Sequence, residues 1–316
     1  MPHDEAYRKI AAIWSDLKIA GEVRRWTPLS GGSISNAWKV ETTEGVFLMK
    51  TGDEAHRAMF EKEAEGLREI AGTGTVAVPR LVGFGTATLE TMAQHEGAEA
   101  HQEARVSDQE ARVSYIVMEF VQGGEAPDTA ERLGRGVAAM HEVKRDRFGF
   151  RHDNFIGRLP QPNGWMEDWV DFLRNRRLGF QADIAAKRGR MPTQRRSRME
   201  RLLAGLDRWI PRNVTPSLLH GDLWGGNWVV GPGGEPYLID PAVFYGDAEL
   251  ELAFTELFGG FPARFYDAYF EVRPIDRKGY AERKPLYQLY YLLVHLNHFG
   301  ESYGPAVDGV LRRYVG

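Results

Sequence analysis

The stretch HGDLWGGN at residues 220–227 constrains the fold of this chain more than any other part of the sequence. An apolar run follows it at 228–230, and a second one at 237–239 leads directly to Asp240. The turn-forming residues 231–234 separate the two runs, a pattern that predicts two short antiparallel strands joined by a tight turn. Such a hairpin would return Asp240 to the end of the glycine-containing stretch.

The hairpin would therefore gather an acid, an amide and a second carboxylate at one point. Phosphoryl transfer needs that set, with Asp222 to orient a hydroxyl and Asn227 and Asp240 to hold Mg²⁺ on the phosphates. The spacing from Asp222 to Asn227 is that of the kinase catalytic loop H-R-D-x-x-x-x-N, with Gly221 in place of arginine. A His-Gly-Asp triplet also arises by chance and Asp240 alone could cap a turn, but the three residues in register favour catalysis.

Length and charge exclude several other classes of protein. The 316 residues suffice for two lobes, and 43% hydrophobic with 27% charged residues is typical of a globular protein. A net charge of −4 gives no support for a nucleic-acid or anionic-membrane partner, and zero cysteines exclude disulfides and thiolate metal sites. With no signal-peptide pattern and no membrane-spanning apolar run, we expect a cytoplasmic protein.

The N-terminal part reads as a short amphipathic helix over 5–17 followed by strands on either side of a small-residue turn at 30–37. Gly31, Gly32 and Ser33 in that turn could lay backbone N–H groups over phosphates, because small residues let the main chain approach closely. The turn is not a G-x-G-x-x-G, so a plain hairpin is the alternative.

The strand that ends at Lys50 is comparable to the V-A-I-K strand of kinases, whose lysine contacts the nucleotide phosphates. The helix expected next, over 55–70, places Glu63 on its apolar face and both Glu61 and Glu65 on the solvent side. A carboxylate buried without a partner is costly, so we expect an ion pair between Lys50 and Glu63. The alternatives are an exposed lysine at a strand end and an incidental, half-exposed glutamate.

Further strands are expected at 76–84 and 115–121. The polar stretch 90–114 between them contains QEARVS twice, which indicates an inserted, exposed loop. Its two histidines are expected to be solvated and not to bind metal.

After residue 118 the periodicity becomes helical. We therefore expect an α+β, bilobal protein-kinase-like fold. A small β-rich nucleotide-binding lobe would span 1–118 and a larger helical lobe, catalytic and substrate-binding, 119–316. The basic run 187–201 lacks interleaved aromatic residues, so it indicates a solvated helix and loop and not a nucleic-acid surface.

The sequence resembles the fructosamine kinase (ketosamine-3-kinase) family, within the aminoglycoside/choline phosphotransferase group of kinase-like folds. The resemblance spans nearly the whole chain apart from 90–114, and three blocks carry it: 148–172, 220–227 and 239–262. It implies ATP-dependent phosphorylation, with Mg²⁺, of the 3-hydroxyl of a ketoamine sugar adduct. The product of that reaction decomposes, so the activity would be a deglycating repair.

The resemblance also implies a role for each motif residue. Asp222 would be the base, and Asn227 and Asp240 would be the magnesium ligands. Lys50 and Glu63 would form the nucleotide-binding pair, and the backbone of Glu119, Phe120 and Val121 would meet adenine. Trp224 is placed to stack on the sugar or, equally, to pack as an ordinary aromatic. His295 and His298 share a helix face, where one is a candidate substrate contact, although core or capping histidines are the default.

Two departures from the family pattern stand out. Some relatives carry a cysteine in the glycine-containing turn that allows redox-controlled dimerisation, whereas this chain has Ser33 there. Glu251 begins Glu-Leu-Ala where related small-molecule kinases tend to carry Asp-Leu-Ala, which we expect to be a conservative structural change. The sequence does not set the oligomeric state, and a monomer is the working expectation.

Two other functions stay open at this point. The first is a kinase of the same fold acting on an aminoglycoside, choline or a simple sugar. An aminoglycoside kinase should have a strongly acidic C-terminal pocket, yet the stretch 303–316 contains only Asp308. The second is a pseudokinase that binds nucleotide or a partner without turnover, which the filled catalytic positions disfavour. The sugar, and whether it is free or protein-linked, cannot be read from the sequence.

Overall fold

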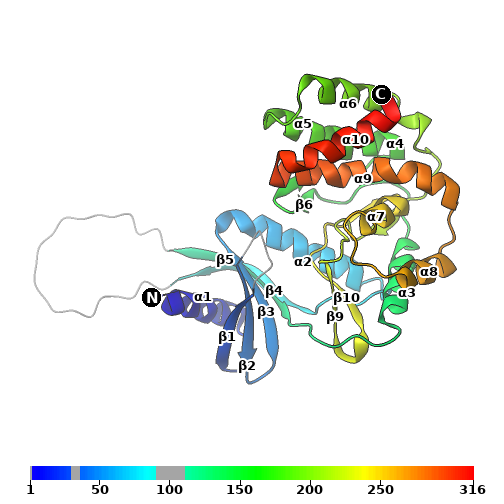
Figure 1. Ribbon diagram of the computed structural model, residues 1–316. Coiled ribbons are helices and arrows are strands. Elements are labelled where there is room, and N and C mark those ends of the chain that lie inside the picture. The colour runs from blue at the N-terminus through cyan, green and yellow to red at the C-terminus, as the bar shows by residue number, and fades with distance from the viewer. Residues whose placement is uncertain (1, 30–35, 90–110) are drawn as a thin grey trace, which may run out of the picture. The chain divides into compact units, whose positions relative to one another are not determined.

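The structure is a computed structural model that describes residues 2–29, 36–89 and 111–316 (Figure 1). The chain divides into two compact units. Unit 1 contains Met1–Ala64 and Arg80–Phe120, and unit 2 contains Glu65–Pro79 and Val121–Gly316. Gly31, Gly32, Ser33 and most of the predicted insertion lie outside the described residues, so the predictions made for them stay predictions.

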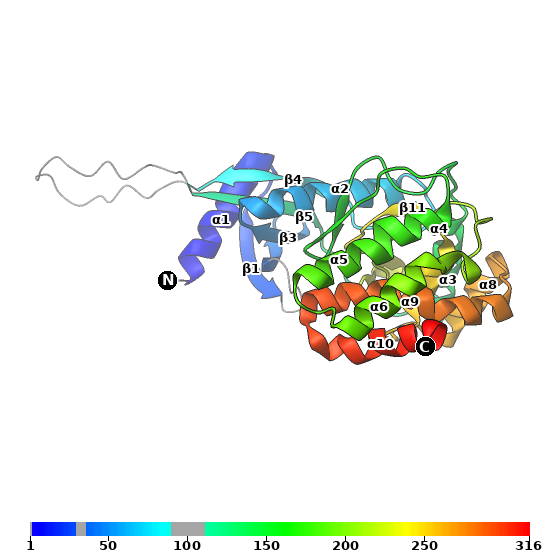
Figure 2. The same cartoon turned by 90° about the horizontal axis from the view of Figure 1, so that it is seen from above.

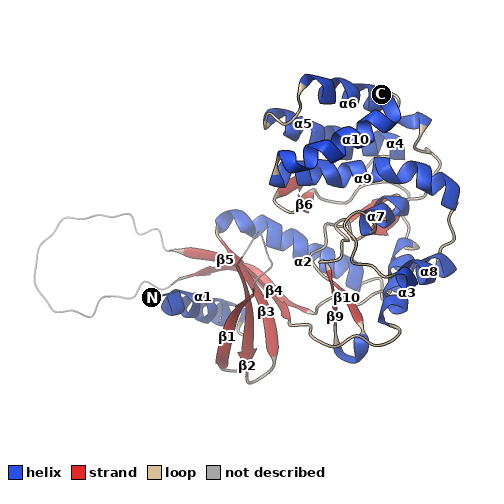
Figure 3. Ribbon diagram, in the orientation of Figure 1, coloured by secondary structure: helices blue, strands red, loops and turns tan. Residues whose placement is uncertain are grey.

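Unit 1 is built on a five-stranded antiparallel sheet in the order β1-β2-β3-β5-β4 (Figure 3). Helix α1 (Pro2–Leu17) covers it because Ile10, Ile13 and Trp14 recur at helical spacing and are buried against the strands. The five strands are β1 (Val23–Leu29), β2 (Asn36–Thr42), β3 (Val46–Gly52), β4 (Leu81–Thr88) and β5 (Arg112–Glu119).

Two strand boundaries differ from the prediction. The segment 76–79 is not a strand: it makes one isolated bridge, between Ala77 and Tyr237 of unit 2, and β4 begins only at Leu81. Pro79 ends that segment, and a proline has no N–H to donate to a sheet. In the other direction, β5 begins at Arg112, so the predicted insertion 90–114 is wrong at its C-terminal end.

Helix α2 (Arg57–Ala71) begins in unit 1 and ends in unit 2. Its buried face contains Phe60, Ala64, Leu67 and Ile70, as its period predicts. The expectation that Glu65 faces solvent is wrong, because Arg151, distant in sequence, covers it: Arg151 Nε donates to Glu65 Oε1 at 2.7 Å.

Unit 2 is mainly helical and is organised around the 23-residue helix α9 (Arg277–Phe299). Figure 2 shows α5 and α10 alongside α9, with α6 beside α10. Its other helices are α3 (Thr129–His141), α4 (Trp169–Phe172), α5 (Gly179–Lys187), α6 (Thr193–Ala204), α7 (Ala248–Thr255), α8 (Ala263–Val272) and α10 (Gly304–Val315). In the described residues, no helix is both long and apolar enough to cross a membrane.

Three short antiparallel strand pairs in unit 2 lie around the HGDLWGGN motif at 220–227. They are β6 (Asn154–Ile156) with β7 (Leu159–Gln161), β8 (Ser217–Leu219) with β11 (Phe244–Gly246), and β9 (Trp228–Val230) with β10 (Pro236–Leu238). Thr129, the first residue of α3, holds the turn between β9 and β10: its hydroxyl donates to Gly234 O at 2.7 Å.

The basic run 187–201 is not simply solvated, because Arg195 is only 2% exposed. Its Nη2 lies 2.6 Å from Glu301 Oε1, and its Nε lies 2.9 Å from Asp308 Oδ1. The single acid of the C-terminal segment is thus used to hold α6 against α10, and it is not part of an acidic pocket.

We expect Arg195→Ala to lower the free energy of unfolding by about 2 kcal/mol at pH 7, because it removes charged hydrogen bonds from a buried group. The hydrogen bonds from Arg195 lower the pKa of both Glu301 and Asp308. Carboxyls with a lowered folded-state pKa stabilise the fold above their unfolded pKa and lose this contribution as pH falls through the folded value. Urea unfolding between pH 3 and 7 should show the difference between wild type and variant shrinking in acid. A pH-independent difference would contradict the ion-pair account.

Candidate active site

The loop between β8 and β9 is shaped by a glycine that no other residue could replace without strain. Gly221 has a φ of +85°, and a Cβ there would lie 2.0 Å from Ala242 O. The close approach is fixed by Ala242 N, which donates to His220 O at 2.8 Å. Glycine at position 221, where the H-R-D pattern has arginine, therefore has a steric reason.

Asp222 and Asn227 are in direct contact, as the loop spacing predicts. Asn227 Nδ2 donates to Asp222 O at 2.7 Å and to Asp222 Oδ2 at 3.1 Å. Burial, followed by the nearby Asp240 carboxylate, raises the pKa of Asp222 well above its ordinary value, while the bond from Asn227 opposes the rise. A raised pKa makes the carboxylate a more effective proton acceptor near neutral pH.

Asp240 follows the predicted hairpin, which the structure contains. Ile239 N donates to Asn227 O at 3.0 Å, so the residue before Asp240 is hydrogen-bonded to the residue that precedes β9. His220 Nε2 donates to the carbonyl of the same Ile239 at 2.8 Å. Asp240 itself adopts a φ of 56°, in the left-handed region that a non-glycine residue rarely enters. The two hydrogen bonds to the backbone of Ile239 help to hold the neighbouring Asp240 backbone in this conformation.

The donors at this point fit Mg²⁺. Because Asn227 uses its amide nitrogen in both bonds to Asp222, its oxygen is the atom available as a ligand, beside the carboxylate of Asp240. Magnesium prefers oxygen and is commonly held by one or two protein groups together with substrate phosphates. The described residues contain no cluster of three or more His, Cys, Asp or Glu side chains that could hold a metal ion.

Glu251, on α7, anchors the backbone of the loop between β8 and β9. Its carboxylate accepts from His220 N at 3.0 Å and from Gly221 N at 2.6 Å, and His141 Nε2 donates to it at 2.9 Å. Burial alone would raise the pKa of Glu251, but the hydrogen bond from His141 and the attraction of the nearby histidines lower it. The sequence marked this position only as a conservative change and missed its role as the acceptor for two loop N–H groups.

A buried polar network supports the segment after Asp240. Gln161 Nε2 donates to Ala242 O at 2.9 Å and to Asn154 Oδ1 at 2.8 Å, while Asn154 Nδ2 donates to Val243 O at 2.9 Å. From α9, Tyr290 OH donates to Gln161 Oε1 at 2.7 Å. These side chains come from the block 148–172, where the sequence offered only a family pattern and no sign of this role.

In unit 1, Lys50 Nζ lies 2.7 Å from Glu63 Oε1, and the two side chains are 11% and 15% exposed. The predicted ion pair is present, because β3 delivers the lysine to the inner face of α2. The use of this pair for nucleotide phosphates stays a prediction.

The segment Glu119–Val121 lies where the chain leaves the sheet. Glu119 N donates to Arg80 O and Phe120 N to Val46 O, each at 3.0 Å, so both donors serve the sheet. Unit 1 ends at Phe120, and Val121 belongs to unit 2. Contact of this backbone with adenine stays a prediction.

Comparison with known proteins decides between the alternatives. Residues 6–316 match the sequence model of the family described as fructosamine kinase. The chain belongs to this family. Its α+β, protein-kinase-like fold is confirmed, and it is a kinase, not a binding module of another class.

Relatives in the fructosamine kinase family align along almost the full chain. A probable ketoamine kinase of Enterococcus faecium is 36% identical over 309 residues, which is 96% of this chain and 99% of that protein. A chloroplastic protein-ribulosamine 3-kinase of Oryza sativa subsp. indica is 34% identical over 291 residues, 91% of this chain and 78% of that one. The crystal structure of a candidate fructosamine-3-kinase from Thermobifida fusca, 28% identical, has a TM-score of 0.80 and covers 96% of this chain and 98% of its own.

The three predicted substrate-side residues of this fructosamine kinase family member have different surroundings. Trp224 is 42% exposed, with its ring folded over Gly226, so it is not a core aromatic. His295 Nδ1 donates to Tyr291 O at 2.8 Å, and His298 Nε2 donates to Ile156 O at 3.1 Å. Burial lowers the pKa of both histidines, so both are neutral at pH 7. Their contact with substrate stays a prediction.

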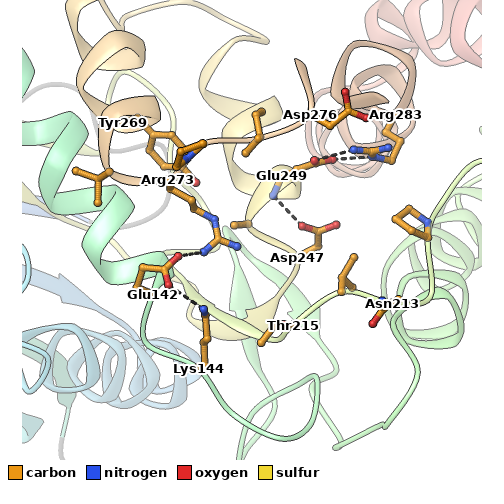
Figure 4. A pocket seen from close by; sticks show the side chains of 16 residues that line it. Glu142, Lys144, Asn213, Thr215, Asp247, Glu249, Tyr269, Arg273, Asp276 and Arg283 are labelled. Carbon is orange, nitrogen blue, oxygen red and sulfur yellow. Dashed lines mark hydrogen bonds and ion pairs between the residues drawn. The ribbon is translucent and has the colours of Figure 1, made fainter. Parts of the chain in front are cut away.

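A polar cavity of about 550 Å³ opens elsewhere on unit 2 (Figure 4). Asp222, Asn227 and Asp240 are not among its lining residues. Its cations are paired across it: Arg283 Nε donates to Glu249 Oε2 at 2.7 Å, for example. The cavity therefore lacks the groups of the candidate active site.

The role of Lys50 can be tested directly. Lys50→Met is expected to raise the KM for ATP at least about tenfold, because a charge-assisted contact to phosphate would be lost. The measurement is initial rate against ATP concentration, with Lys144→Met, a substitution of an exposed lysine, as the control. An unchanged KM for ATP would show that the Lys50–Glu63 pair is only structural.

Proposed function

We propose that this chain is an ATP-dependent ketosamine-3-kinase that transfers a phosphoryl group to the 3-hydroxyl of a ketoamine adduct. The observation that carries the proposal is the contact between Asp222 and Asn227, with Asp240 returned to them by the β9–β10 hairpin. The names of the relatives, ketoamine kinase and protein-ribulosamine 3-kinase, support the acceptor class.

In this proposal Asp222 accepts or orients the proton of the 3-hydroxyl. Asn227 holds one carboxylate oxygen of Asp222, which leaves the other to face the hydroxyl. Glu251 keeps the loop backbone in place, so the groups need little reorganisation during the reaction. Magnesium, held by Asn227 and Asp240, supplies charge stabilisation on the phosphates when it is bound.

The remaining roles belong to the same proposal. Residues 1–118 bind the nucleotide through Lys50, supported by Glu63, and the larger part binds the sugar, with Trp224 beside it. Phosphorylation at the 3-position would mark the adduct for decomposition, which makes the activity a deglycation. The acceptor class is a ketoamine of the fructosamine or ribulosamine type, free or linked to protein.

The deciding test is ATP consumption by the purified protein with Mg²⁺ and four acceptors: a fructosyl-amine, a ribulosyl-amine, an aminoglycoside and choline. Turnover on either ketoamine and on neither control supports the proposal. Turnover on a control alone would keep the kinase fold and overturn the acceptor class.

A further inference from the structure

Unit 2 contains a buried arginine that the proposed reaction does not use. Arg177 is fully buried, and burial lowers the pKa of its guanidinium to about 10, so the group is still charged at pH 7. It is bound by neutral acceptors: Nη1 donates to Pro162 O and Nη2 to Asn163 Oδ1, each at 2.7 Å. Within the described part of the chain its Nε has no hydrogen-bond partner. A buried charge held only by neutral groups costs free energy that an apolar side chain of similar size would not, so an arginine here indicates a role other than stability.

A π-helical turn, Leu173–Leu178, determines where this arginine points. Gly179 N donates to Arg174 O, five residues back, and a Cβ on residue 179 would lie only 2.6 Å from that oxygen. In an α-helix, side chains five residues apart point about 140° away from each other, whereas a π turn brings them to the same face. The guanidinium carbon of Arg177 accordingly lies 4.6 Å from the ring centre of Phe172, five positions before it. Single π turns of this kind are frequent at functional sites.

Arg177 is linked to the start of β11 in two ways. Its guanidinium carbon lies 3.9 Å from the ring centre of Phe244, the first residue of that strand. The second link is a chain of amides: Asn163, which accepts from Arg177, donates through Nδ2 to Asn154 Oδ1 at 2.8 Å. Asn154 donates in turn to Val243 O at 2.9 Å. One cation thereby fixes a ring and, through two amides, the backbone of the residue before it.

The segment that Arg177 holds follows closely on a candidate magnesium ligand. Only Pro241 separates Asp240 from Ala242, whose N–H donates to His220 O at 2.8 Å. Proline restricts its own φ to a narrow range, so a shift of the backbone at 242–244 is passed on to Asp240. Asp240 has a φ of 56°, and a residue in that region keeps its conformation only while its surroundings hold it. Loosening the contacts of the segment after Asp240 should therefore loosen Asp240 as well.

We propose that Arg177 is a positioning residue for the metal ligand Asp240. It acts through the ring of Phe244 and the amides of Asn163 and Asn154, which hold the backbone after that ligand. An arginine is needed because a planar guanidinium can donate to two oxygens and lie against a ring at the same time, which neither lysine nor a neutral side chain does. The inference rests on the metal-ligand part of the proposed function and is independent of the acceptor.

The experiment measures metal binding without turnover. Protein saturated with a non-hydrolysable ATP analogue is titrated with Mn²⁺, which takes the same oxygen ligands as Mg²⁺, and electron paramagnetic resonance reports the free ion. Arg177→Met keeps the length of the side chain and removes its charge and donors, and we expect it to lower the affinity for Mn²⁺ about three- to tenfold. This is less than the roughly 10–100-fold typical of a group bonded directly to a metal ligand. Affinity for the analogue without metal should stay the same, and Arg177→Lys, which retains a cationic donor, should restore part of the affinity for Mn²⁺.

Arg195→Met is the matched control, because it separates positioning from general stability. Arg195 is another arginine of unit 2 that is almost fully buried, at 2% exposed, but its partners are Glu301 and Asp308. We expect this variant to be less stable in urea and to bind Mn²⁺ with the affinity of wild type.

A second variant keeps the inference testable if Arg177→Met fails to fold. Asn163→Asp retains the oxygen that accepts from Arg177 and brings a carboxylate to the buried charge, so the fold should be preserved. The same substitution replaces the group that donates to Asn154 by an oxygen, which breaks the chain of amides. Affinity for Mn²⁺ should therefore fall in a variant whose free energy of unfolding falls less than that of Arg177→Met.

Three outcomes would overturn the inference. If folded Arg177→Met, or Asn163→Asp in its place, binds Mn²⁺ with wild-type affinity, Arg177 only contributes to the fold. If Arg195→Met weakens Mn²⁺ binding as much as Arg177→Met does, the effect comes from lost stability. If wild type with the analogue binds no Mn²⁺, the metal site itself fails. Failure of the proposed acceptor is recognised separately, because wild type would then phosphorylate no ketoamine while Mn²⁺ binding still depended on Arg177.

Discussion

Asp222→Asn is expected to lower kcat by about 10²–10⁴-fold while ATP binding is retained. Asparagine has nearly the same shape as aspartate, so the bonds from Asn227 to the backbone and side chain at this position can persist in part. It cannot accept the proton of a substrate hydroxyl. Single-turnover phosphorylation of a ketoamine, together with calorimetric titration of ATP, separates the loss of chemistry from the loss of binding.

The control for this experiment is Asp207→Asn, which alters an exposed aspartate whose contact is a long one, 3.8 Å to Arg212 Nη2. Its kinetics should equal those of wild type. Full activity in Asp222→Asn would point to another base for the substrate hydroxyl.

The second large effect is expected at Glu251. Replacing it by alanine leaves the N–H groups of His220 and Gly221 and the ring of His141 without their shared acceptor, all in a fully buried position. Removing one member of a buried charged network costs about 3–5 kcal/mol. We expect a fall of that size in the free energy of unfolding measured with urea, and loss of activity even at temperatures where the variant remains folded.

Glu271→Ala is the matched comparison, because Glu271 pairs with Arg135 at the surface and its side chain is 62% exposed. Exposed pairs of this kind contribute little, about 0–1 kcal/mol. Similar stability losses in the two variants would refute the view that Glu251 anchors the loop.

The elements that the sequence predicts correctly are those set by short-range patterns. The β9–β10 hairpin follows from two apolar runs and a turn, and it alone brings Asp240 back towards Asn227. The Lys50–Glu63 pair follows from the phase of one helix. In both cases the residues that contact each other lie at most 13 positions apart in the sequence.

The features that sequence reasoning missed depend on contacts between distant segments. Gln161 reaches Ala242 across 81 positions, and Tyr290 reaches Gln161 across 129. Glu65 was placed in solvent because a helical period says nothing about Arg151, which lies 86 positions further on. Partners of this kind cannot be deduced from local pattern, since any polar residue in the chain could supply them.

The position of α9 in the sequence, after the catalytic loop, has a consequence for biosynthesis. Tyr290 and Tyr291 on this helix donate to Gln161 and to the backbone of Gly221, so two contacts that support the loop come from a helix that is made after it. Until the ribosome has made α9, Asp222 and Asp240 have been synthesised but lack these contacts. A chain without α9 therefore cannot hold the loop as the folded protein does.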